Sequence, residues 1–381
     1  MPAIYLDNNA TTAIDPRVAE AIGTEYSAGP ANASSQHAVG RKAQSRIEDA
    51  LEMIAGCIDT RFDQPGGPRL IFTSGGTESN NLALTGIGEA GPIVISKIEH
   101  PSVIAVAEMI AQLGREVRWL DVDSEGEIRV DQLESLVAGD NSPATLVSIM
   151  SANNETGVVQ PINEVAEICR NAGVPLHVDA TQTVGKLPTS CANSGAAAVS
   201  FAAHKFHGPT GVGGLWIDAG VKVRPLLHGG EQQLETRPGT EPVPLIVGMA
   251  LALQLATDEL EASITSMTRL RDHLERALIK RHPEIVVHGQ SKPRLPGTTC
   301  LSFAGVDRQS MLMALDMAGI ACSSGSACSS GSSPPSHVLI AMNRPETEIN
   351  SALRFGVSKF STLDEIDRAI DSISNVYNHL R

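Results

Sequence analysis

The 381-residue sequence predicts an α/β fold in which a large, mostly parallel sheet is followed by a smaller α+β C-terminal domain. Two observations predict this class. Short apolar segments alternate with helical patterns over residues 69–217, and after about residue 250 the pattern changes to long helices with a few strands. Strands that alternate with helices favour a parallel sheet. We therefore expect an N-terminal segment over 1–14, a large domain over 15–250 and a small domain over 251–381.

Seven apolar segments are the expected strands of the large domain. They cover residues 69–74, 92–96, 116–121, 145–150, 174–179, 197–201 and 213–217. Helices are expected between them. Over 162–169, for example, apolar residues recur at helical spacing between Pro161 and the stop signal Gly173. Ligands of such sheets gather at the carboxyl ends of the strands, so functional residues are expected there.

The pattern of the C-terminal part begins with an apolar segment over 244–256. This segment is shorter than the ~20 residues that cross a bilayer, so we expect a buried helix. Strands are expected around 284–287 and 298–303, followed by further helices. The last helix is expected to start at a capping box formed by Thr362 and Glu365.

Charge and cysteine usage indicate which partners and which cellular compartment to expect. The 43 acidic and 29 basic side chains give a formal charge of −14, which argues against nucleic acid or an anionic membrane as the main partner. The first residues lack the basic and apolar regions of a secretory signal. Six cysteines are scattered without a disulfide-rich spacing. We expect free thiols and a cytoplasmic location.

The segment LIFTSGGTESNN has the features of a phosphate site. An apolar strand runs through Gly75 and Gly76 into Thr77 and a helix, whose first N–H groups and positive dipole end favour an anion. The alternative is that the glycines merely allow the chain to turn. The segment matches neither the dinucleotide nor the Walker pattern, so a phosphate that is not part of a nucleotide is favoured.

Two charged residues follow later strands. Asp179 lies at the carboxyl end of a buried strand, where its charge requires a cation such as a protonated pyridine nitrogen. An ordinary ion pair or a helix cap would also satisfy it. Lys205 ends another strand and is a candidate Schiff-base lysine, although a lysine at a sheet edge is usually only solvated. Together with the phosphate site, the two residues indicate a pyridoxal phosphate enzyme more strongly than either does alone.

A series of motifs resembles a known family along nearly the whole chain. They are YLDNNATT at 5–12, SGGTESNN at 74–81, SKIEH at 96–100, NNETGVVQP at 153–161, HVDATQ at 177–182, HK at 204–205, RPGT at 237–240 and SSGSACSSG at 323–331. The chain resembles a cysteine desulfurase of the NifS/IscS type, within the class V branch of fold-type I pyridoxal phosphate enzymes. The resemblance implies pyridoxal 5′-phosphate as cofactor, L-cysteine as substrate and a homodimer, with the N-terminal segment contributing to the active site.

The resemblance also implies a role for individual residues. Lys205 would carry the cofactor and shuttle protons, Asp179 would bind the pyridine nitrogen, and His100 would stack on the ring and be a second acid or base. Contacts to the phenolic oxygen and the phosphate would come from Asn154, Gln182, Gly76, Thr77, His204 and, from the partner subunit, Thr240. The substrate would be held by Arg354 with Asn32 and Asn154. For Arg354 the plain alternative is a surface salt bridge.

Cys328 resembles the sulfur acceptor of the family. It lies in the Ser/Gly-rich segment 322–336, which we expect to be a mobile loop that carries a persulfide to a recipient. Cys322 is close by, but its apolar left flank predicts the end of a strand. Core packing is the expected role of Cys57, Cys169 and Cys300.

A zinc site is the alternative use of these side chains. It would combine His204, His207, Cys322 and Cys328, but no pair among them has the spacing of zinc-finger ligands. We therefore expect no metal.

Three positions depart from the family pattern. Ala202 replaces the usual hydroxyl residue before His204, so one phosphate contact is expected to be lost. Gly356 replaces a serine and Ala33 a proline, which concerns substrate geometry rather than the class of reaction.

The expected activity is conversion of L-cysteine to L-alanine, with sulfur passed to Cys328 as a persulfide. A sulfur-acceptor protein, such as an iron–sulfur scaffold, would be the next partner. A selenocysteine lyase or an aminotransferase on the same scaffold is the nearest alternative, and SSGSAC argues against it. A cofactor-free scaffold or binding protein is the alternative from another class, with Ala202 as its only indication.

Overall fold

A seven-stranded sheet forms the centre of the computed structural model, which describes residues 3–140, 142–325 and 334–381. The strand order is β2-β8-β7-β6-β5-β3-β4. The strands are β2 (Arg69–Thr73), β3 (Ile93–Ser96), β4 (Val117–Leu120), β5 (Leu146–Met150), β6 (Leu176–Asp179), β7 (Ala198–Ala202) and β8 (Gly213–Ile217). The seven expected strands are therefore present, with shifts of a few residues at their ends.

Strand β8 is the exception to the expected parallel arrangement. It runs antiparallel to both of its neighbours, β7 and β2, whereas β4, β3, β5, β6 and β7 are parallel to one another. A parallel return needs a crossover of a dozen or more residues, usually a helix. Only the 3-10 turn η1 (Ala203–Lys205) and a short loop join β7 to β8, so the chain reverses.

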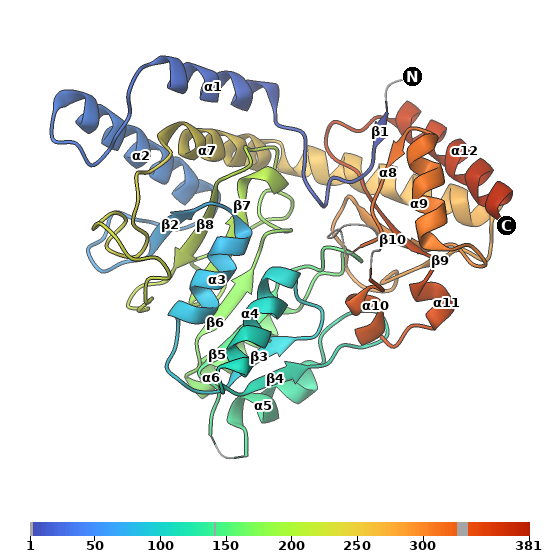
Figure 1. Cartoon of the computed structure of the whole chain (residues 1–381), viewed down its shortest axis with the longest axis horizontal. Coiled ribbons are helices and arrows are strands. Elements are labelled where there is room, and N and C mark those ends of the chain that lie inside the picture. The colour runs from blue at the N-terminus through green and yellow to red at the C-terminus, as the bar shows by residue number, and fades with distance from the viewer. Residues whose placement is uncertain (1–2, 141, 326–333) are drawn as a thin grey trace.

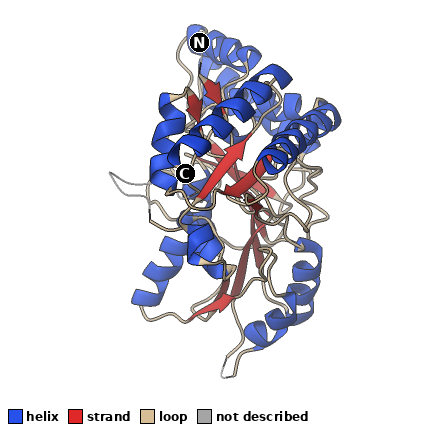
Figure 2. Ribbon diagram, turned by 90° about the vertical axis from the view of Figure 1, so that its right-hand side faces the viewer, coloured by secondary structure: helices blue, strands red, loops and turns tan. Residues whose placement is uncertain are grey.

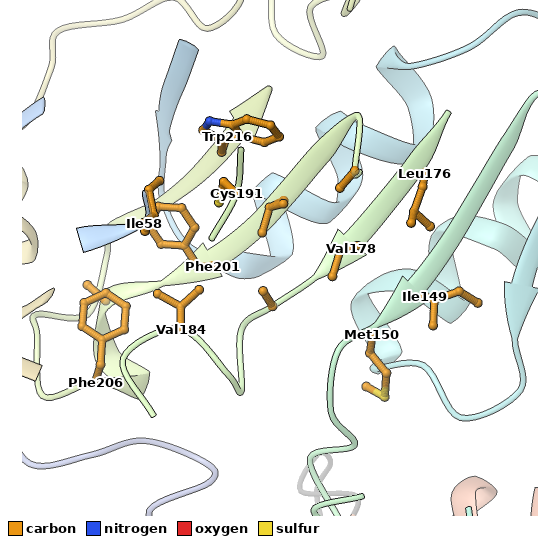
Figure 3. Packing of buried hydrophobic residues seen from close by; sticks show 14 of the residues in the cluster. Ile58, Ile149, Met150, Leu176, Val178, Val184, Cys191, Phe201, Phe206 and Trp216 are labelled. Carbon is orange, nitrogen blue, oxygen red and sulfur yellow. The ribbon is translucent and has the colours of Figure 1, made fainter. Parts of the chain in front are cut away.

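Helices cover both faces of this sheet (Figures 1 and 2). Those of the first 200 residues are α1 (Pro16–Ser27), α2 (Ala38–Cys57), α3 (Gly76–Gly86), α4 (Pro101–Gln112), α5 (Val130–Ala138) and α6 (Ile162–Ala172). Successive strand side chains point to opposite faces. In β8, Trp216 accordingly joins one core cluster and Leu215 and Ile217 another. The first cluster, part of which is drawn in Figure 3, packs Trp216, Phe201, Ile58 and Cys191 closely together.

The C-terminal part has its own three-stranded antiparallel sheet in the order β12-β10-β9. Its strands are β9 (Val286–Val287), β10 (Thr298–Ser302) and β12 (Ala352–Gly356). The expected strand at 284–287 is shorter than predicted. Strand β12 was not predicted, because its five residues are all buried and show no alternation of polar and apolar side chains.

The N-terminal segment pairs with the C-terminal part rather than with the large sheet. Strand β1 (Ile4–Tyr5) runs parallel to β11 (Ile320–Ala321), and Ile4 and Leu6 join the core cluster of the C-terminal part. This pairing leaves the following residues, Asn8 to Thr12, between the two parts of the protein. Such a contact between segments more than 300 residues apart leaves no local pattern in the sequence.

The remaining helices are α7 (Val243–Asp258), α8 (Leu260–Arg281), α9 (Arg308–Met317), α10 (His337–Ala341), α11 (Glu346–Ile349) and α12 (Leu363–Leu380). Of these, α7 packs on α1 and α2 of the large part, whereas α8 and α9 pack on the C-terminal sheet. The predicted buried helix over 244–256 is confirmed as α7, and Thr362 and Glu365 form the predicted capping box of α12. Within the described ranges no single helix is long and apolar enough to cross a membrane. Helices α7 and α8 reach that length and apolar composition only together, and the pair is bent by 73°.

Candidate active site

A cavity of about 230 Å³ lies where strands of the large sheet end and helices begin. Its lining comes from Ala10, Gly76, Thr77, Asn80, His100, Ser102, Met150, Ala152, Asn154, Asp179, Thr181, Gln182, Ala202, His204 and Lys205. The structure thus brings eight of the predicted site residues to one cavity. The N-terminal segment reaches it through Ala10.

The start of α3 forms one end of the cavity. Gly75 precedes the helix with a φ of 151°, and no side chain caps the first turn. A helix that starts without a side-chain cap leaves backbone N–H groups available to an anion. The Glu78 side chain points elsewhere, because it accepts from Ser74 N at 2.7 Å and pairs with Arg237 at 2.9 Å. The lining residues Gly76 and Thr77 can therefore hold a phosphate.

Asp179 ends β6 and is only 4% exposed. Its two oxygens accept from Thr181 N at 2.9 Å and from Asn80 Nδ2 at 2.8 Å. None of the ion pairs found among the described residues includes this carboxylate. A buried carboxylate with donors but no cation is suited to a ligand that brings the positive charge.

Lys205 ends the turn η1 directly after β7. Its Nζ atom donates to the carbonyl oxygens of Asn9 at 2.6 Å and Ala10 at 2.7 Å, so the N-terminal segment orients the amine. Burial, with a smaller contribution from the charge of Arg354, lowers the pKa of the Lys205 ammonium to about 8. An amine of this kind is partly neutral, and therefore nucleophilic, near pH 7.

Two histidines complete the polar lining. His100 is the N-cap of α4, and burial lowers the pKa of its imidazole. His204 Nδ1 lies 3.1 Å from the Thr11 hydroxyl, and burial lowers the pKa of this imidazole to about 4. Both rings are therefore neutral near pH 7 when nothing is bound.

The cavity fits pyridoxal phosphate by the chemistry of its groups. It combines a helix start for a phosphate, a buried carboxylate without a cation for a protonated ring nitrogen, and a lysine amine of lowered pKa. The Oδ1 atom of Asn80 and the hydroxyl of Thr181 are also buried and lack a hydrogen-bond partner. Unsatisfied polar atoms at a cavity are expected where a ligand is to bind.

Four predicted site residues do not line this cavity. Arg354 is buried in β12 and contacts Asp7 and the Asn154 carbonyl, so it is not the surface salt bridge considered as its alternative. Asn32 and Thr240 are exposed. Cys328 lies outside the described residues. That Thr240 reaches the phosphate site of the partner subunit stays a prediction, as does the role of Asn32 in substrate binding.

Cys169 and Cys300 are buried in a core cluster as expected, and the half-buried Cys57 packs against the same cluster. Cys57 ends α2, Cys169 lies in α6 and Cys300 in β10, and all are free thiols. Burial raises the pKa of the Cys322 thiol to about 12, so it is a poor nucleophile near pH 7. No group of three or more metal-ligating side chains occurs within the parts of the chain that the structure describes.

The sequence model of the aminotransferase class-V family matches residues 4–369. The chain belongs to this family, among its NifS/IscS-like cysteine desulfurases. A cysteine desulfurase of Nostoc sp. is 40% identical over 385 residues, which is 100% of this chain and 94% of that protein. The X-ray structure of a NifS-like protein from Rickettsia africae has a TM-score of 0.89 at 33% identity and covers 99% of both chains. A structure of SspA in complex with cysteine has a TM-score of 0.79 at 30% identity, covering 94% of this chain and 99% of that one.

Three polar residues of the cavity were not predicted from the sequence. Asn80 and Thr181 lie within the recognised motifs SGGTESNN and HVDATQ, and Ser102 lies two places after the end of SKIEH. Ser102 follows His100 at the start of α4, where a hydroxyl commonly binds backbone or side-chain partners. That position was the one available signal.

Proposed function

We propose that the protein is a pyridoxal phosphate-dependent cysteine desulfurase that converts L-cysteine to L-alanine and transfers the sulfur to Cys328 as a persulfide. The observation that carries this proposal is the cavity in which the amine of Lys205, the carboxylate of Asp179 and the start of α3 converge. Membership of the class-V family supports the choice of cofactor. The substrate is supported by relatives that are cysteine desulfurases and by SspA, which was solved in complex with cysteine.

The residues of the cavity divide the work of binding the cofactor. The backbone of Gly76 and Thr77 would hold the phosphate, with His204 beside it. Asp179 would keep the ring nitrogen protonated, and Gln182 and Asn154 would face the phenolic oxygen. When bound, pyridoxal phosphate supplies an electron-withdrawing ring that stabilises negative charge on the substrate Cα atom.

Lys205 would perform the proton transfers on the substrate. Burial lowers the pKa of its ammonium group to about 8, and Nζ donates to the carbonyl oxygens of Asn9 and Ala10. The ammonium and the neutral amine both carry N–H groups, so both forms can make these hydrogen bonds. His100, on another element of the same cavity, is the second candidate for an acid or base. Each group can then give or take a proton near neutral pH.

Arg354 would hold the substrate carboxylate. It is 3% exposed, and its Nε atom is buried without a hydrogen-bond partner, so part of the guanidinium fork is left for a ligand. Asp7 and the Asn154 carbonyl fix the rest of the fork at 2.7 and 3.1 Å. Fixed donors lose little freedom when they bind a carboxylate.

The sulfur step leaves one product in solution and one on the enzyme. The Cβ–S bond of L-cysteine breaks, an S–S bond forms with the Cys328 thiolate, and a proton replaces sulfur on the substrate carbon to give L-alanine. No external oxidant is needed, because the carbon is reduced as the two sulfur atoms are oxidised. A protein acceptor, such as an iron–sulfur scaffold, would then take the persulfide sulfur, and a cytoplasmic location suits this thiol chemistry.

A homodimer would complete the phosphate site through Thr240 of the partner subunit. Thr240 is exposed in the single chain, and the large apolar residues Leu226, Leu227 and Leu234 of the preceding segment are exposed as well. Exposed apolar side chains that gather in one segment are typical of a surface covered by a partner.

Product analysis with matched variants tests this proposal. We expect L-alanine and a persulfide on Cys328 when wild-type protein loaded with pyridoxal phosphate receives L-cysteine, and loss of both products in Cys328→Ser. Cys322→Ser is the matched control and is expected to retain activity. Undiminished alanine formation by Cys328→Ser without added thiol would contradict the persulfide step. A wild-type protein that binds no cofactor would favour the scaffold alternative, and faster turnover of selenocysteine or a keto acid would favour the other enzymes.

A further inference from the structure

Both the backbone and the side chain of Ser102 contact the ring of His100. His100 Nδ1 accepts from the backbone N–H of Ser102 at 3.1 Å, and it lies 2.8 Å from the Ser102 hydroxyl. A backbone N–H can only donate, so Nδ1 must carry its lone pair. The Ser102 hydroxyl consequently donates to Nδ1, and the proton of the neutral ring is on Nε2.

Asn80 continues this arrangement towards Asp179. Its Nδ2 atom donates to the Ser102 hydroxyl at 2.9 Å and to Asp179 Oδ2 at 2.8 Å. The opposite amide orientation would direct Asn80 Oδ1 at the carboxylate, which offers no proton when it is ionised. Asn80 and Ser102 are 1% and 9% exposed, so water does not compete for these bonds. The hydrogen bonds therefore have fixed directions: Asn80 donates to Asp179 and to Ser102, and Ser102 donates to His100.

We propose that Ser102 and Asn80 are positioning residues, which hold the neutral imidazole of His100 with its proton on Nε2 and leave that nitrogen to the cofactor cavity. No hydrogen bond to Nε2 is formed within the described ranges, and His100 is part of the cavity lining. The inference rests on the proposed function, in which His100 is an acid or base beside the cofactor. It specifies that His100 starts the reaction able to donate a proton from Nε2.

The same bonds favour the neutral form of His100. Two donors face Nδ1, and protonation of Nδ1 would place a third N–H against them. Burial acts in the same direction and lowers the pKa. Among the charged groups that act on the ring, Asp179 raises the pKa, whereas Lys205, His337 and Arg354 lower it. Variants of Ser102 leave these four groups in place, so they isolate the contribution of its hydroxyl.

Nitrogen-15 NMR of histidine-labelled full-length protein tests the inference, with and without pyridoxal phosphate. The His100 signals are identified by their absence in His100→Gln. In wild-type protein above the His100 pKa, we expect the shift of a bare nitrogen at Nδ1 and of a protonated nitrogen at Nε2. A protonated Nδ1 in the neutral ring would overturn the proposal.

Matched substitutions at Ser102 provide the second readout. Ser102→Ala removes the donor that favours the neutral ring, so the His100 pKa is expected to rise. Ser102→Thr keeps the hydroxyl and is expected to restore the wild-type value. A His100 pKa that stays the same or falls in Ser102→Ala would show that the hydroxyl has only a structural role, and would overturn the proposal.

The contribution of Asn80 is measured by a double-mutant cycle. If Asn80 acts through Ser102, Asn80→Ala is expected to shift the His100 pKa more in the wild-type background than in Ser102→Ala. Equal shifts in both backgrounds would remove Asn80 from the proposal. These titrations do not depend on turnover. Their failure in a protein that still desulfurates cysteine would therefore reject the positioning role alone, whereas loss of cysteine turnover with normal titrations would reject the proposed function.

Discussion

Arg354 Nη2 lies 2.7 Å from Asp7 Oδ1, and this ion pair joins the C-terminal sheet to the N-terminal segment. The side chains are 3% and 19% exposed. Asp7 is followed by Asn9 and Ala10, whose carbonyl oxygens receive the Lys205 amine. The proposed substrate anchor and the proposed cofactor lysine are therefore oriented by the same short segment of chain.

This relationship predicts the behaviour of Arg354→Lys. The variant keeps the charge beside Asp7 but loses the planar fork, so KM for L-cysteine is expected to rise by roughly 10-fold or more, which corresponds to about 1.5 kcal/mol for one charged hydrogen bond. Steady-state kinetics with circular dichroism as a fold control measure it. An unchanged KM in a correctly folded variant would remove Arg354 from the substrate site.

The lowered pKa of Lys205 predicts a pH dependence for cofactor capture. The neutral amine is the nucleophile, and burial brings the pKa of the ammonium to about 8 instead of 10.5. The rate at which cofactor-free protein takes up pyridoxal phosphate should therefore rise with pH and level off above about pH 8. Stopped-flow absorbance measures this rate. A rate that continues to rise up to pH 10 would indicate an ordinary lysine.

Substitution of Ala202 by serine is predicted to strengthen cofactor binding. Ala202 is fully buried in the lining of the cavity, close to Gly76 of the proposed phosphate site, and offers no polar side-chain atom. A hydroxyl there can add a hydrogen bond to a charged group, so Ala202→Ser is expected to tighten cofactor binding about 10-fold. Ala202→Cys, which adds an atom of similar position but a weak donor, is the control for volume. Equilibrium titration of cofactor fluorescence compares them, and equal affinity of the two variants would argue against a phosphate contact at this position.

Asp15 predicts how stability depends on pH. Its carboxylate is nearly fully buried and binds Arg17 at 2.7 Å and Lys359 at 3.0 Å, and these partners hold its pKa well below the usual range. Because the pKa of Asp15 is lower in the folded state, its ionised carboxylate adds its full contribution to the free energy of unfolding above the unfolded-state pKa of about 3.9. This contribution is lost as the pH falls towards the folded-state pKa. Asp15→Asn is expected to lower the free energy of unfolding at pH 7 by about 1–3 kcal/mol.

Urea unfolding at a series of pH values checks this expectation. The difference between wild type and Asp15→Asn should be constant above about pH 5 and shrink below about pH 4. A difference that stays the same down to pH 3 would show that the charge of Asp15 is not what stabilises the fold.

Some features of the fold and of the site could be predicted from the sequence, and others could not. Asp179 and Lys205 could be placed because one apolar strand ends at Asp179 and another is followed directly by the turn that carries Lys205, and strand ends of a parallel sheet meet at one edge. The reversal of β8 could not be predicted from its residues, because strand direction depends on the connection. Asn80 and Ser102 come together only when α3 and α4 pack against each other, so their hydrogen bond has no local pattern. The pairing of β1 with β11 was hidden for the same reason.

Reduction of the cofactor-loaded protein with borohydride, followed by peptide mass spectrometry, tests the central claim most directly. Borohydride fixes pyridoxal phosphate to the amine that holds it, and we predict a single modified peptide, with the cofactor on Lys205. Lys205→Ala should give no modified peptide, while Lys186→Ala, which removes the other amine close to Gln182, should be modified at Lys205 as the wild type is. Modification of a different lysine in the wild type, or no modification of a protein that turns over L-cysteine, would contradict the account.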